Sequence, residues 1–262
     1  MNEQACTLHL IAVVHRGMGH LAQAARHFKR SLALAEQGGD LLGQARNLHD
    51  LGLLHGLQGG FAQARRFLEQ SLEIRKQLQD RQGLALTSLE LGSISRQEHR
   101  FDEARRWIEE SLCLAQSLGD KFSRGRALSE LGKLLVDLRE FVEAHERFQQ
   151  ALRLQETIHD VRGQCITLYK LADLERELGN LDEAVQRHRE SAHLAEKGRI
   201  PYWEGLNHIG LGRCARQRND LDQAKSAFES VYFLARRHRL KDLQQLALHE
   251  LSSTETGGTG DG

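Results

Sequence analysis

The chain has little of several features that mark other classes of protein. A single proline in 262 residues excludes a collagen-like or proline-rich chain. The longest apolar run, Leu8 to Val14, is interrupted by His9, so no segment reaches the roughly 18 to 20 apolar residues of a membrane span. The Met1 end also lacks the charged flank, apolar centre and cleavage site of a signal peptide. The sequence therefore predicts a cytoplasmic protein that does not enter a membrane.

Charge and cysteine content exclude further classes. The 36 basic and 36 acidic residues cancel, which argues against binding to nucleic acid or to an anionic membrane surface. An aromatic content of 5% also weakens an RNA-binding interpretation. Cys6, Cys113, Cys165 and Cys214 form no C-x-x-C pair, as expected for packing thiols in a reducing cytosol. We expect no nucleic acid and no membrane among the partners.

What the chain does have is an internal period of 40 residues. One column of this period holds Ala24, Ala64, Ala104, Ala144, Ala184 and Ala224. Apolar residues stand three positions before each alanine, and mostly apolar residues stand four positions after it. Small residues, in most units serine, stand seven positions after it. This is the spacing of one face of an amphipathic helix.

A second set of columns lies upstream in the same period. An apolar residue is followed by a small one at Ile11-Ala12, Leu51-Gly52, Leu91-Gly92, Leu131-Gly132, Leu171-Ala172, Leu211-Gly212 and Leu251-Ser252. Each unit therefore holds two amphipathic helices. Because glycine inside a helix costs about 0.5 to 1 kcal/mol relative to alanine, the recurring glycines predict that two helix backbones approach closely there.

Turn and cap residues separate the helices. Gly59-Gly60, Gly179-Asn180 and Asn219-Asp220 mark turns within units. Junctions between units carry Gly39-Asp40, Gln79-Asp80, Gly119-Asp120 and His159-Asp160, where a glycine can end one helix in the left-handed conformation and an aspartate can cap the next. At the next junction Pro201 fits the first turn of a helix, where its missing N–H costs little.

The pattern predicts an all-α chain of about thirteen helices, arranged as a right-handed superhelical solenoid of helix-turn-helix repeats. Its expected units are 1–40, 41–80, 81–120, 121–160, 161–200 and 201–240, followed by a capping helix at 241–252 and a disordered tail at 253–262. In the capping helix Leu243, Leu246, Leu248 and Leu251 form an apolar stripe, and Glu250 belongs to the polar side expected to face solvent.

These columns resemble the tetratricopeptide repeat (TPR), as in Leu48, Leu51-Gly52, Ala64, Leu68 and Ser71 of the second unit. The 40-residue period is similar to the long-helix variant of bacterial sensor regulators and Leu-Gly-Asn adaptors. The resemblance implies a scaffold for protein interaction whose concave face is lined by the first helix of each unit. The asparagine with which the family clamps peptides after Leu-Gly is missing in every unit, as is the paired lysine and asparagine of its carboxylate clamp.

Nothing in the sequence points to catalysis, a metal or a cofactor. The segment Arg16 to Ala22 satisfies the G-x-G-x-x-A dinucleotide pattern, but a helix rather than a strand precedes it. The fourteen histidines include no His-x-x-x-His pair, and several merely occupy equivalent columns of successive units. We therefore expect no enzyme and no cofactor.

The first-helix columns that the resemblance places on the concave face give the candidate binding residues. They are His9, Val13, His49, Leu53, Leu57, Leu89, Lys133, Tyr169, Arg176, Arg213 and Arg216. The first half of this set is apolar or weakly polar and the second half is rich in arginine. It therefore predicts a ligand with an apolar helix face followed by an acidic segment, unless the arginines pair with acidic residues of the scaffold.

Two functions remain open at this point. The first is a protein-protein interaction scaffold that binds a peptide or helix of a partner protein. The second is a sensor or regulatory segment of a signalling or transcription-regulator system, which would need an effector domain elsewhere. The first helix carries apolar residues on more than one face, including Leu8, Leu10, Ile11, Val13 and Val14. We expect this face to be covered, by self-association or by another domain or partner.

Overall fold

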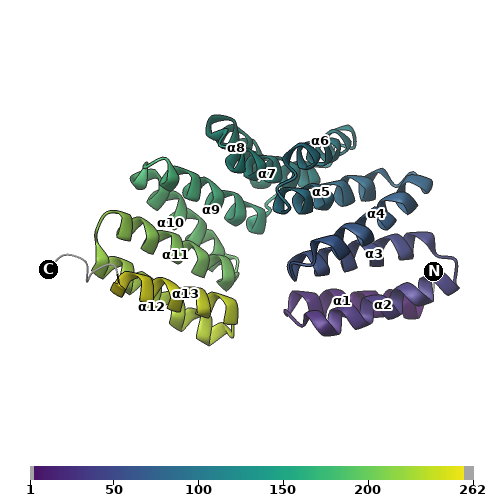
Figure 1. The fold of residues 1–262 in the computed structure, drawn as a ribbon, viewed down its shortest axis with the longest axis horizontal. Coiled ribbons are helices and arrows are strands. Elements are labelled where there is room, and N and C mark those ends of the chain that lie inside the picture. Colours follow the sequence, from purple (N-terminus) through teal and green to yellow (C-terminus); the bar gives the residue numbers. More distant parts are fainter. Residues whose placement is uncertain (1–2, 257–262) are drawn as a thin grey trace. The chain divides into compact units, whose positions relative to one another are not determined.

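The computed structural model describes residues 3–256, without the side chains of residues 255 and 256. Within that stretch there are thirteen α-helices and no strand (Figure 1). The helices are α1 (Glu3–Gly17), α2 (Leu21–Gln37), α3 (Leu41–Leu57), α4 (Phe61–Gln77), α5 (Arg81–Gln97), α6 (Phe101–Ser117), α7 (Lys121–Asp137), α8 (Phe141–Thr157), α9 (Val161–Glu177), α10 (Leu181–Lys197), α11 (Pro201–Gln217), α12 (Leu221–His238) and α13 (Lys241–Thr256). The predicted all-α fold of tandem helix pairs is confirmed.

The chain forms two compact units, Met1–Leu134 and Leu135–Gly262, and the boundary falls inside α7. Each unit is a row of helix pairs (Figure 1). We call the odd-numbered helices first helices and the even-numbered helices second helices. In the N-terminal unit α1 contacts α3 and α3 contacts α5, whereas the second helices α2 and α4 make no such close backbone contact. The first helices therefore form the more tightly spaced layer.

The C-terminal unit shows the same asymmetry between its layers. There α11 contacts both α9 and α13, while α10 and α12 make no comparable contact. The layer whose helices lie closer together takes the inner side of any curvature. The exposed side of the first helices is thus the inner face of each unit.

Aspartate caps begin several helices as the sequence predicts. The carboxylates of Asp40, Asp80 and Asp160 each accept a hydrogen bond from the backbone N–H three residues later, at 2.9 Å. Asp220 caps α12 in the same way at 3.0 Å. Pro201 occupies the first turn of α11, where a backbone N–H has no partner inside the helix.

The turns repeat every 20 residues, and at each one a single residue has a positive φ. Five of these residues are glycines, at 19, 39, 59, 119 and 179. The other seven are Gln79, His99, Arg139, His159, Arg199, Asn219 and Arg239, with φ between 53° and 62°. Of these seven, only Asn219 was recognisable as a left-handed position from its residue type.

The repeated columns form the core of each unit. The six alanines of the second helices are all fully buried, and so are the residues four positions later: Phe28, Leu68, Ile108, Phe148, His188 and Phe228. The serine column has a polar role. The hydroxyls of Ser31, Ser71 and Ser111 each donate a hydrogen bond of 2.7 Å to the backbone carbonyl 26 residues earlier, in the first helix of the same pair.

The last helix ends later than predicted. α13 ends at Thr256 instead of residue 252, and the side chain of Thr254 is buried. Residues 253–256 are therefore helical, and the part of the expected tail from 257 to 262 lies outside the described residues. None of the helices in residues 3–256 is both long and apolar enough to cross a bilayer.

Candidate partner-binding surface

The candidate surface is the exposed side of the first helices, treated separately in each unit. Four of the predicted residues, His9, His49, Leu89 and Tyr169, share one column of the repeat. Leu89 is 1% exposed and Tyr169 is 7% exposed, so both are packing residues in this structure. This column faces the neighbouring first helix: His9 Nδ1 lies 3.1 Å from Asn47 Oδ1.

The same link between neighbouring first helices recurs one repeat later. His49 Nδ1 on α3 lies 3.2 Å from Thr87 Oγ1 on α5. Burial lowers the pKa of His49 to about 4, so the imidazole is neutral near pH 7. His9 and His49 therefore join neighbouring first helices, and both remain partly exposed.

Predicted residues in the next column are more accessible. Val13, Leu53, Lys133 and Arg213 are each partly exposed. Leu57, at the end of α3, is 69% exposed. In the N-terminal unit, Val13 on α1 and Leu53 and Leu57 on α3 form an accessible apolar surface.

Acidic residues of the first helices neutralise several of the predicted cations. Glu250 on α13 is 4% exposed, and its Oε1 lies 2.6 Å from Arg213 Nη2 while its Oε2 lies 2.9 Å from Arg216 Nη1. The prediction that Glu250 faces solvent is wrong, because α11 presents two arginines to this side of α13. Arg213 and Arg216 are paired inside the scaffold, with a partner that the sequence did not identify.

Equivalent ion pairs occur in the N-terminal unit. Asp50 on α3 is 9% exposed, and its carboxylate receives Arg16 Nη1 at 2.5 Å and His9 Nε2 at 3.4 Å. Lys133 pairs with Glu130 one turn earlier on α7. A sequence signal for these pairs exists, since the acid follows the arginine by 34 residues in both Arg16–Asp50 and Arg216–Glu250.

Lys133 is thus also paired with an acidic residue of the scaffold. Although burial opposes it, Lys133, followed by Arg96 and Arg126, holds the pKa of Glu130 below its usual range. Arg126 additionally pairs with Glu90 on α5 at 2.7 Å. Arg213 and Arg216 therefore stabilise a contact between repeats, whereas Lys133 and Arg176 each pair with an acidic residue of their own helix.

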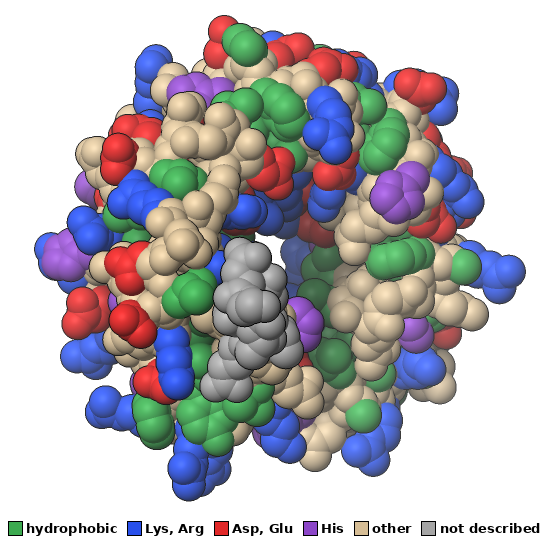
Figure 2. Space-filling model, turned by 60° about the vertical axis from the view of Figure 1, so that its left-hand side comes forward, with side chains coloured by type: hydrophobic (Ala, Val, Ile, Leu, Met, Phe, Trp, Pro, Cys, Tyr) green, Lys and Arg blue, Asp and Glu red, His purple; other side chains and the backbone are tan. Residues whose placement is uncertain are grey.

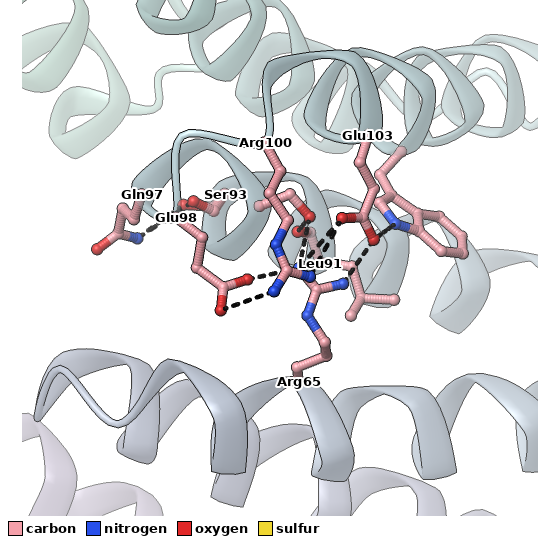
Figure 3. A network of polar contacts seen from close by, with 9 residues as sticks. Arg65, Leu91, Ser93, Gln97, Glu98, Arg100 and Glu103 are labelled. Atoms are coloured by element: carbon pink, nitrogen blue, oxygen red, sulfur yellow. Dashed lines mark hydrogen bonds and ion pairs between the residues drawn. The ribbon is translucent and has the colours of Figure 1, made fainter.

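A separate charge cluster lies at the turn between α5 and α6 (Figure 3). Arg65 of α4 reaches Glu98 at 2.6 Å and Glu103 at 2.5 Å, and donates a hydrogen bond to Ser95. Arg100 lies 3.7 to 3.8 Å from the same two carboxylates. Because these charges satisfy one another, the cluster ties α4 to the next repeat and leaves little for a ligand to bind.

Charges of both signs are mixed on the face of the described residues seen in Figure 2. Figure 2 shows Lys and Arg side chains interspersed with Asp and Glu side chains over the face in view. No group of three or more His, Cys, Asp or Glu side chains among the described residues is arranged to hold a metal ion. The four cysteines are free thiols, and burial raises the pKa of Cys165 to about 11, which leaves it protonated near pH 7.

A tandem array of such helix pairs defines an all-α solenoid repeat protein. The family model of the tetratricopeptide repeat matches residues 3–77, 83–157 and 163–237, which is most of the chain. The chain belongs to the tetratricopeptide repeat family, as the repeated Leu-Gly and alanine columns predicted. This family is generally non-catalytic. No curated protein sequence matches the chain.

Several solved structures share the fold at low sequence identity. A Rap protein complexed with Competence and Sporulation Factor has a TM-score of 0.74 at 13% identity, covering 97% of this chain and 75% of its own. A STAND protein with a tetratricopeptide repeat sensor from Pyrococcus horikoshii has a TM-score of 0.66 at 15% identity. The match covers 100% of this chain and 40% of the STAND protein chain. A chain of the APC/C hetero-tetramer Cut9-Hcn1 has a TM-score of 0.65 at 17% identity. The match covers 94% of this chain and 43% of that one. These likenesses show the fold alone.

Proposed function

We propose that the chain is a protein-protein interaction scaffold whose first helices bind a peptide or helix of a partner protein. The observation that carries this proposal is the accessible apolar surface of the N-terminal unit. Val13, Leu53 and Leu57 lie on its first helices, and Leu57 is 69% exposed. An apolar helix face of a partner would remove this surface from water at about 25 cal/mol per Å².

The architecture supports binding over catalysis. Each repeat buries its apolar face only against its neighbours, an arrangement that provides no single central core in which to build a dry active site. The Rap complex and the Cut9-Hcn1 assembly agree with a peptide or protein as the kind of partner. A non-enzymatic role in the cytoplasm, with neither nucleic acid nor membrane as partner, completes the proposal.

The test is affinity capture from the native cell with paired variants, followed by binding measurements with the purified partner. Leu57→Glu places a charge on the apolar first-helix surface and should weaken binding of the partner at least tenfold. Leu118→Glu is the matched control, since Leu118 is also exposed but is the C-cap residue of the second helix α6. Equal binding by both variants would contradict the first-helix surface and move attention to the second helices.

A sensor or regulatory segment is the second candidate, because the Rap protein and the STAND sensor share this fold. The same capture experiment distinguishes the two functions. A partner that carries an effector domain, and whose activity changes when it binds this chain, favours the regulatory segment. A partner without such a domain favours the plain scaffold.

A further inference from the structure

Large side chains meet at one repeated position between the two helices of a pair. His55 on α3 stacks on Phe67 of α4 with ring centroids 5.4 Å apart, and two stacked histidines occupy the same two columns of α1 and α2. In the last such pair, α11 and α12, both columns hold alanine, at Ala215 and Ala227. The bulk that fills this position in the first two repeats is therefore missing from the sixth.

A polar link from the preceding second helix is missing at the same place. His145 Nε2 on α8 lies 3.2 Å from Glu175 Oε1 on α9. Forty residues later the same two columns hold Val185 on α10 and Ala215 on α11, and neither side chain has a polar atom. The second helices α10 and α12 make no close backbone contact, although α11 contacts both. These losses leave a cavity of about 320 Å³ between α10, α11 and α12.

Five of the residues that line this cavity are basic or polar. They are Arg189, His208, Arg218, Gln223 and Ser226. Two of them replace residues of another kind in the preceding repeat. His208 stands in the column of Leu168, which is fully buried. Gln223 stands in the column of Glu183, whose carboxylate lies 2.6 Å from Arg187. The last repeat thus has an amide where the preceding one has a paired acid.

No acidic residue lines the cavity, which leaves two guanidinium groups and one imidazole without a carboxylate in the lining. Arg218 does pair with Asp182 at 2.5 Å, but the Asp182 side chain is fully exposed, and ion pairs in water contribute little. The Arg189 side chain is exposed, and the described residues form no ion pair with it. Other acids of α10 and α12 are exposed and lie outside the lining, namely Glu190, Asp220, Asp222 and Glu229. The lining therefore favours an anion.

We propose that this cavity binds the phosphate group of a small phosphate ester. Such a group carries about −1.5 to −2 charges at pH 7 and three strong acceptor oxygens, whereas a carboxylate carries one charge and two oxygens. The guanidinium forks of Arg189 and Arg218 match phosphate oxygens, and Gln223 and Ser226 can donate further hydrogen bonds. The apolar part of the wall, which includes Leu211, contacts the esterified group.

The volume restricts the size of this ligand. About 320 Å³ is near the lower limit of ligand pockets, which hold about 300 to 1,000 Å³, so a small ester fits. The site goes beyond the proposed function. It lies between second helices of the C-terminal unit, whereas the proposed partner surface lies on first helices of the N-terminal unit.

Phenyl phosphate is the probe, and benzoate is the comparison. Both have one aromatic ring, but benzoate carries a single negative charge. Isothermal titration of the full chain at about pH 7.5 and low salt should give a Kd for phenyl phosphate about tenfold lower than the Kd for benzoate.

Three variants locate the site. Ala227→Phe places the phenyl group of the Phe67 column in the cavity and should abolish measurable binding of phenyl phosphate. Arg189→Gln should raise its Kd about tenfold, because one charge-assisted contact is lost. Arg237→Gln is the matched control, since Arg237 is an exposed arginine of α12 that does not line the cavity. Circular dichroism melting curves establish that each variant folds, and if Ala227→Phe does not, the exposed Arg189→Gln carries the test.

The proposal is overturned if phenyl phosphate fails to bind or binds no more tightly than benzoate. It is also overturned if folded Arg189→Gln keeps the wild-type affinity, or if folded Ala227→Phe does. An equal loss in Arg237→Gln would overturn it as well, since the effect would then follow net charge alone. None of these outcomes bears on the partner surface, which the comparison of Leu57→Glu with Leu118→Glu tests by itself.

Discussion

Gly52 on α3 and Leu68 on α4 pack so closely that a Cβ atom on Gly52 would lie 2.6 Å from Cγ of Leu68. The same contact recurs in two other repeats. A Cβ atom on Gly92 would meet Ile108 at 2.6 Å, and one on Gly212 would meet Phe228 at 2.4 Å. The glycine that the sequence pattern places after leucine is therefore required by the distance between the paired helices.

Replacing Gly52 with alanine should destabilise the chain, although alanine is the better helix former. Overpacking of this kind costs about 1 to 3 kcal/mol, which exceeds the gain of about 1 kcal/mol in helix propensity. Gly17→Ala is the control, since no atom lies within 4 Å of its added Cβ. Urea unfolding followed by circular dichroism should show a lower midpoint for Gly52→Ala and an equal or higher one for Gly17→Ala. A rise in both midpoints would refute the close approach.

At the turn residues that have a positive φ but are not glycine, substitution by glycine should stabilise the chain. Gln79 has a φ of 53°, a conformation that costs a residue with a Cβ about 1 to 2 kcal/mol. Gln79→Gly should therefore raise the free energy of unfolding by about 0.5 to 1 kcal/mol, after the loss of chain entropy is included. Gly59→Ala should lower it, because Gly59 has a φ of 75° with open space around it. Thermal unfolding of both variants tests the pair, and equal shifts would contradict it.

The fold followed from the sequence because one chemical feature repeats in register. Ala64 and Leu68 reveal a buried helix face only when the same columns return every 40 residues. The left-handed turns did not follow, since Gln79 and His99 have no intrinsic preference for positive φ. The packing of the flanking helices imposes that conformation, and residue type alone does not report it.

The candidate site followed less well from the sequence. The columns identified first helices correctly, but Leu89 and Tyr169 are buried between those helices and not exposed. The burial of Glu250 was missed because the polarity of α13 alone does not show that α11 carries Arg213 and Arg216 opposite it. Contacts between helices far apart in the chain determine which polar residues remain available to a partner.

Glu250 should contribute to stability through its two arginines. Glu250→Gln leaves Arg213 and Arg216 without their carboxylate and should lower the free energy of unfolding by about 1 to 3 kcal/mol. Glu229→Gln on α12 is the control, because Glu229 is exposed. Thermal unfolding of the two variants provides the comparison. Similar melting temperatures would mean that the Glu250 pairs add nothing beyond surface charge.

His49 should make stability depend on pH. Burial lowers its pKa to about 4, with Asp50 opposing and Arg75 and Arg126 adding to the effect, while the unfolded chain keeps a value near 6.5. Between these two values the unfolded state binds a proton that the folded state does not. Stability is thus unaffected by His49 above about pH 6.5 and decreases as the pH falls toward 4, by about 1 to 3 kcal/mol in total.

The measurement compares urea midpoints at about pH 7 and pH 5 in wild type and His49→Gln. The glutamine can still bond to Thr87 but does not titrate, so the variant should lose less stability over this interval. An equal loss in both proteins would assign the pH dependence to other groups.

The exposed face of α1 leads to the last prediction. Ile11 is 38% exposed and Val14 is 55% exposed, whereas Leu51 and Leu54, their counterparts on α3, are fully buried against α1 and α2. The same face of a first helix is therefore built to pack on a neighbouring helix pair. Leu10, at 64% exposed, extends the apolar area on α1.

A second copy of the chain supplies helices of the required kind, so we predict association through α1. Light scattering over rising protein concentration should show a dimer, and Leu10→Glu should return it to a monomer. Leu248→Glu is the control, because Leu248 is 49% exposed on α13, where polar residues surround it. A monomer at every concentration, with Leu10→Glu leaving solubility unchanged, would show that this face stays exposed to solvent. Dissociation by Leu248→Glu alone would place the contact on α13 instead.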